Sequence, residues 1–197
     1  MLYIPIPPLH AALLGPVNQC IKYLEAIEKV GFNAFTKSIH VVKEDYQGTT
    51  YEGNECHKIL KNLELLKDKI MCEIEKWDPE GDSDEMAFAL DLIQALEAVK
   101  NFYTACCGHE LKGQWKNSIL QFRKVFSGLL QNHGFSISNK LHIIMDHSEE
   151  YITETKTPLG HVNDQLIESA HAHMNKRLMA SNYLVMDILL VKNMVKN

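Results

Sequence analysis

The sequence contains no run of 18 apolar residues, no Cys-x-x-Cys pair and no excess of basic residues. Without a long apolar run, we expect no membrane-spanning segment. The net charge of −5 excludes a bulk electrostatic signature of nucleic-acid binding, so any DNA contact must come from a local patch or from another part of the protein. The odd number of cysteines, five, has no framework spacing, which favours free thiols in a reducing compartment.

The N-terminal stretch "MLYIPIPPLHAALLGP" is apolar but is not read as a signal peptide, because prolines interrupt it and it lacks a cationic start. An intracellular location, nuclear or cytoplasmic, is therefore expected. The chain has 197 residues, of which 46% are hydrophobic and 23% charged, a composition that suits a globular protein with a real core. We predict one domain over residues 1–197, with an internal loop at 77–84 inside the helix-breaking stretch "WDPEGDSDE".

Apolar residues recur at intervals of three and four along most of the chain, which predicts an all-α fold of six or seven helices. One short strand at 37–43 is the single expected exception. In the 77–84 loop, Asp82 and Glu85 resemble a capping box that would start the next helix. The expected helices are 16–30, 54–76, 84–106, 114–132, 138–155, 161–179 and 182–195.

Half of the chain's ten histidines lie in one stretch, "LHIIMDHSEEYITETKTPLGHVNDQLIESAHAHMNKR", at 141–177. His142 and His147 are five residues apart, a spacing that recurs in zinc sites, and Asp146 lies beside them. On a helix, however, residues five apart differ by about 140° around the axis. Because the histidines flank a core stripe of apolar residues, ordinary boundary positions on an amphipathic helix explain them equally well.

Glu168 is the carboxylate of interest in the second half of this stretch. With Asp164 and His171 it projects to one side of the helix expected at 161–179. A Glu-x-x-His pair on a bundle helix is typical of di-iron carboxylate proteins, but that fold needs a second such pair, which is absent here. A solvated glutamate on a polar face is the simpler interpretation.

Residues 140–183, "KLHIIMDHSEEYITETKTPLGHVNDQLIESAHAHMNKRLMASNY", resemble the C-terminal part of the catalytic core of DDE transposases, the class that includes the recombination-activating recombinase and Transib-like enzymes. "YEGNECHKILKN" and "PPLHAALLGPVN" are similar to the helical insertion of the same family and to its entry. The resemblance covers residues 7 to 183. It implies a zinc pair at His142 and His147, a turn at Leu159 and Gly160, and the third catalytic carboxylate at Glu168.

The resemblance also implies what this chain lacks. The family's first two catalytic aspartates lie on strands of an RNase H-like sheet, and a Cys-x-x-Cys pair completes its zinc site. Neither is found here. The chain therefore looks like the helical insertion and the final catalytic helix without the sheet, that is, a fragment or remnant of a transposable-element recombinase that is inactive alone. In the intact enzyme the cofactors would be Mg²⁺ or Mn²⁺ and Zn²⁺, and the partner would be DNA.

Two alternatives from other classes stay open. The apolar tail "YLVMDILLVKNMV" could form a protein-interaction face, including one for a homo-oligomer, although closure of the core explains it too. A metal-binding helical protein could instead combine the side chains named above: His142, Asp146, His147, Glu168 and His171.

Overall fold

The computed structural model describes residues 12–43 and 50–161, all within one compact unit. These residues contain no β-strand, which confirms the all-α prediction. The predicted extent of the domain, 1–197, stays a prediction because residues from 162 onward lie outside this part. The described helices are α1 (Gly15–Ile27), α2 (Lys29–Ser38), α3 (Gly53–Lys61), α4 (Leu63–Ile74), α5 (Asp84–Cys106), α6 (Trp115–His133), α7 (Asn139–Thr155) and the short 3-10 helix η2 (Leu159–His161).

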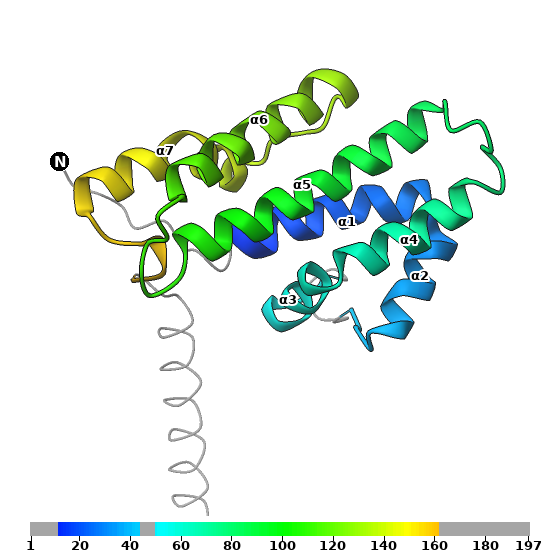
Figure 1. Ribbon diagram of the computed structural model, residues 1–197, viewed down its shortest axis with the longest axis horizontal. Coiled ribbons are helices and arrows are strands. Elements are labelled where there is room, and N and C mark those ends of the chain that lie inside the picture. The colour runs from blue at the N-terminus through cyan, green and yellow to red at the C-terminus, as the bar shows by residue number, and fades with distance from the viewer. Residues whose placement is uncertain (1–11, 44–49, 162–197) are drawn as a thin grey trace, which may run out of the picture. The chain divides into compact units, whose positions relative to one another are not determined.

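Helix α5 is the centre of this unit (Figure 1). It packs against α6 on one side and against α3 and α4 on the other, while α1 runs alongside it. Helix α7 packs on α6, and α2 packs on α4. Among these described helices, none is long and apolar enough to cross a membrane.

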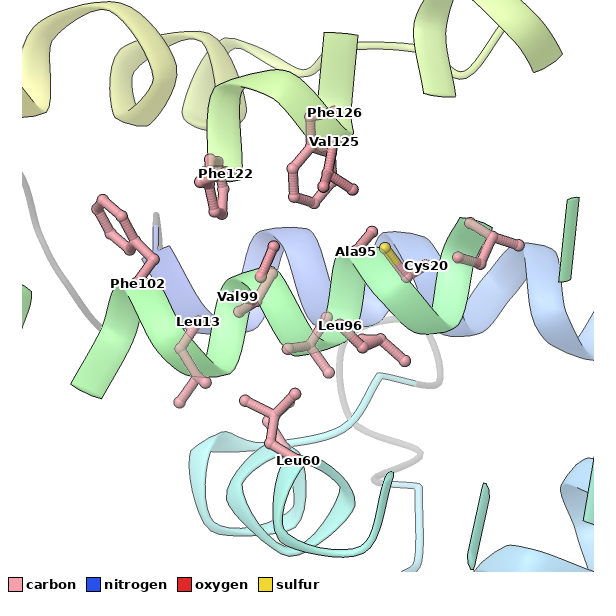
Figure 2. Close-up of a cluster of buried hydrophobic side chains, with 14 of the residues drawn as sticks. Leu13, Cys20, Leu60, Ala95, Leu96, Val99, Phe102, Phe122, Val125 and Phe126 are labelled. Carbon is pink, nitrogen blue, oxygen red and sulfur yellow. The ribbon is translucent and has the colours of Figure 1, made fainter. Parts of the chain in front are cut away.

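The core forms where α5 meets its neighbours. Phe122 and Phe126 point from α6 toward Phe102 and Val99 of α5 (Figure 2), and the rings of Phe102 and Phe122 lie 5.0 Å apart between centroids. From the opposite side, Leu60 of α3 points toward α5. Because α5 is covered on several sides, its buried residues are not confined to one stripe.

Three helices match the sequence-based boundaries closely. The expected helix 84–106 coincides with α5. The helix expected at 114–132 differs from α6 by one residue at each end, and the helix expected at 138–155 differs from α7 by one residue at its start. Local signals explain this agreement. Gly134, in the left-handed conformation at φ 63°, terminates α6, and the Ser138 hydroxyl accepts a hydrogen bond from the Leu141 N–H at the start of α7.

The region before residue 44 departs from the prediction. The helix expected at 16–30 ends at Ile27, because Glu28 leaves the helical conformation and its carboxylate accepts hydrogen bonds from the Val30 and Gly31 N–H groups. A new helix, α2, starts there and continues to Ser38. The strand predicted at 37–43 is therefore wrong: its first two residues are helical and 41–43 have no regular structure.

Gly31 follows the helix expected at 16–30, a position typical of a helix terminator, but it lies inside α2 where that helix crosses α4. A Cβ atom on Gly31 would lie 2.5 Å from the carbonyl oxygen of Lys69, which is closer than packed atoms approach. Only glycine lets the two backbones come this near.

Two further details differ from expectation. The helix predicted at 54–76 is two helices, α3 and α4, that meet at Asn62, whose side-chain amide donates to the Lys58 carbonyl. The capping box at Asp82 and Glu85 is also wrong. Ser83 is the N-cap of α5, and its hydroxyl accepts a hydrogen bond from the Met86 N–H.

Candidate functional site

Helix α7 carries the predicted zinc pair, and its orientation is set by its apolar side. Leu141, Ile144 and Met145 are buried against the rest of the unit, so the histidines on either side of this stripe face outward. Arg123 of α6 ties the two helices together. Its Nη1 lies 2.8 Å from Glu149 Oε2, and its Nε donates to the carbonyl of Met145.

His142, Asp146 and His147 form one exposed group on α7. The Nδ1 atom of His142 lies 2.6 Å from Oδ2 of Asp146, one helical turn later. The His142 and His147 rings meet edge to face, with centroids 5.7 Å apart and planes at 84°. The side chains of His142 and Asp146 are 58% and 53% exposed, so both are accessible to a ligand from outside.

This geometry determines which nitrogen of His142 is available. When Nδ1–H donates to a carboxylate, Nε2 carries the free lone pair, and this arrangement orients metal-ligating histidines in proteins. A structural zinc ion takes four ligands, of which this pair supplies two. In the part of the chain that the structure describes, no group of three or more His, Cys, Asp or Glu side chains could hold a metal ion.

The cysteines are not poised to complete the site. All five lie among the described residues, none of them forms a disulfide there, as expected, and four of them are buried. Burial raises the pKa of Cys106 to about 12, and burial together with the charge of Glu55 raises that of Cys56 to about 12. Zinc binds the thiolate, so thiols held in the neutral form are poor ligands.

The turn that follows α7 is anchored to the end of α5. Leu159 is fully buried, and a Cβ atom on Gly160 would overlap the carbonyl oxygen of Cys107. Residue 160 therefore has to be glycine for the chain to pass this point. Beyond this turn, Asp164, Glu168 and His171 lie outside the described residues, as does the apolar tail, so their predicted roles stay predictions.

Another histidine–carboxylate pair was not anticipated. His133, at the end of α6, lies 2.8 Å through Nε2 from Oδ2 of Asp91 on α5, and its ring stacks on Phe88 at 4.5 Å between centroids. These residues are more than 40 positions apart in the sequence, and no local spacing indicates that they meet.

Comparisons of this chain with family models, with curated proteins and with solved structures found no match. The assignment of function therefore depends on the geometry above and on the resemblance of the sequence motifs.

Proposed function

We propose that this chain is the helical part of a DDE-type transposase, with half of a structural zinc site on α7 and the third catalytic carboxylate at Glu168. The single observation that supports it best is the group on α7. His142 and His147 lie edge to face on an exposed surface, and Asp146 contacts Nδ1 of His142, which leaves Nε2 as the free nitrogen. The protein would act on DNA in the nucleus, as a homo-oligomer or with a partner that supplies the missing parts.

The residues present are of a type that binds zinc, but there are too few of them to complete a zinc site. Two imidazoles are suitable donors, and the remaining two would have to come from a Cys-x-x-Cys pair elsewhere in the intact enzyme. Zinc there would join α7 to the rest of the catalytic core. In this chain alone, we expect only weak binding, because a two-ligand site leaves half of the coordination to water.

Glu168 would serve a different metal. DNA cleavage and strand transfer use a pair of divalent ions that stabilise the attacking and leaving oxygens, and Mg²⁺ prefers carboxylate ligands. A lone glutamate offers too little to hold such an ion. The chain is therefore proposed to be inactive until two further aspartates are supplied.

A zinc titration against a chromophoric chelator tests the α7 site in the full chain. Weak binding should disappear in His142→Ala and in His147→Ala, and it should survive in His109→Ala, an exposed histidine outside α7. Tight binding that persists in both α7 variants would refute the site.

The catalytic assignment needs a separate test. The gene region before the codon for Met1 can be read for an aspartate-bearing strand and a Cys-x-x-Cys pair. If a protein that includes them cleaves DNA with Mg²⁺, Glu168→Gln should abolish cleavage and leave DNA binding intact. Wild-type cleavage by that variant would refute the role of Glu168.

A further inference from the structure

Acidic residues are absent from 111–145, between Glu110 and Asp146. The whole chain has 20 Lys and Arg against 25 Asp and Glu, so the remainder of the chain has 15 basic residues against 25 acidic ones. The segment thus carries a net charge of +5 within a protein whose other residues sum to −10. Its five basic residues are Lys112, Lys116, Arg123, Lys124 and Lys140.

This segment forms all of α6 and the start of α7, on the side of α5 opposite to α3 and α4 (Figure 1). One side of α6 is buried against α5 through Phe122, Val125 and Phe126 (Figure 2). The other side, which we name the outer face of α6, is exposed and consists of lysines, amides and two leucines: Lys116, Asn117, Leu120, Gln121, Lys124, Leu130, Gln131 and Asn132.

Arg123 is not part of the available charge, because it already binds Glu149 and the Met145 carbonyl. Lys116 and Lys124 are exposed, and no ion pair within the described residues engages either of them. They are separated by about 12 Å along the helix axis, since each residue adds 1.5 Å. That span equals the rise of roughly three or four base pairs along the axis of duplex DNA, at about 3.4 Å per phosphate of one strand.

Gly128 lies on the same side of α6. A Cβ atom added there would meet no other atom within 4 Å, so internal packing does not require glycine at this position. Glycine inside a helix is less stable than alanine, and a common reason for keeping it is the close approach of a ligand to the backbone. Gly128 also borders a cleft of about 190 Å³ between α5 and α6.

The cleft gives the outer face of α6 a concave border. Gln121, Lys124 and Asn132 line it from α6, and Gln94 lines it from α5. Asp91 is the acidic residue in its lining, and its carboxylate is bound by His133. The lining therefore holds three amide side chains and one lysine beside this single carboxylate.

We propose that the outer face of α6 docks on the phosphate backbone of duplex DNA. Lysine ammonium and side-chain amide groups are the donors that commonly bind phosphate oxygens, and such contacts position a protein without reading sequence. The remainder of the chain carries a net charge of −10 and as a whole repels DNA, which favours contact at this segment. The choice of duplex DNA rests on the proposed function, whereas the location of the face rests on the charges alone.

Fluorescence anisotropy with a short labelled duplex of random sequence, at low salt, tests the lysines. The double variant Lys116→Gln/Lys124→Gln should bind about tenfold more weakly, and the slope of log affinity against log salt should fall by about two. The matched control, Lys67→Gln/Lys100→Gln, removes two exposed lysines from a surface shared with acidic residues on α4 and α5 and should bind like the wild type.

A second variant adds charge where no packing is disturbed. Gly128→Glu places a carboxylate on the outer face and should abolish DNA binding while circular dichroism and the melting temperature show an intact fold. Asn101→Glu, at an exposed position on α5, is the control for added charge and should retain binding.

Several results would overturn the proposal: no binding of duplex DNA by the wild type at low salt, equal loss in both lysine pairs, or binding of single-stranded RNA in place of duplex DNA. Failure here is distinguishable from failure of the proposed function. Zinc binding that depends on α7 without DNA binding would refute this face alone. DNA binding that depends on Lys116 and Lys124, with zinc binding insensitive to His142 and His147, would refute the zinc site and retain the face.

Discussion

Two histidine–carboxylate pairs in this protein have similar distances and different surroundings. His133 and Asp91 join α6 to α5 at 2.8 Å, and the His133 side chain is only 14% exposed. His142 and Asp146 lie one turn apart on α7 at 2.6 Å, and the His142 side chain is 58% exposed. The shorter distance belongs to the pair that water surrounds.

The difference shows that distance alone does not rank the contribution of a pair to stability. An exposed pair gains little, because water screens the attraction and both side chains lose freedom. His133 gains in addition from stacking on the Phe88 ring, 4.5 Å away between centroids. We infer that His133 stabilises the fold. His142 contributes little to stability, so its ring is available to bind a ligand.

The largest expected effect comes from removing the His133 ring, which is mostly covered by its neighbours. His133→Ala should lower the free energy of unfolding by about 2 kcal/mol, because Phe88 loses its stacking partner and Asp91 loses its hydrogen bond. His142→Ala should change it by less than about 0.5 kcal/mol. Urea unfolding followed by circular dichroism measures both, and equal effects would abolish the distinction between the pairs.

Double-mutant cycles compare the two pairs directly. We expect a coupling free energy of about 1 kcal/mol between Asp91 and His133, and of less than about 0.5 kcal/mol between His142 and Asp146. The coupling between His142 and Asp146 should vanish in concentrated salt, because that pair is exposed. The coupling between Asp91 and His133 should persist. A larger coupling on α7 than between α5 and α6 would contradict the comparison.

A third histidine, His57, shows how burial affects the pH dependence of stability. His57 is half-buried against the Tyr103 ring, and burial, with a smaller contribution from Lys61, lowers its pKa below the ordinary value of 6.5. As pH falls through that value, the unfolded chain takes up the proton before the folded protein does, so stability falls. In His57→Gln, the loss of stability between neutral and acidic pH should be smaller than in the wild type, as measured by urea unfolding at each pH.

The smallest expected effect concerns the tautomer of His142. Asp146→Asn should leave stability within about 0.5 kcal/mol of the wild type, because the pair is exposed. Nitrogen NMR of the ring should nevertheless show that the Nδ1–H tautomer, which Asp146 favours, is less populated in the variant. An unchanged tautomer ratio would mean that Asp146 does not orient the ring in solution.

Local features of the sequence determined much of this fold. The apolar periodicity of 84–106 predicts α5 without error, since this signal depends only on the 3.6-residue turn of the helix. The sequence also indicates helix ends that depend on local groups, such as Gly134 after α6. The pairing of His142 with Asp146 belongs to the same class, because residues four apart on any helix are neighbours.

Only the tertiary structure decided the rest. Gly31 resembles a helix terminator in the sequence, yet it lies inside α2 because α4 passes against its backbone. His133 meets Asp91 because α6 packs on α5, although more than 40 residues separate the two side chains. Contacts of this kind depend on how helices cross, and crossing is set by the packing of whole faces rather than by the spacing of neighbouring residues.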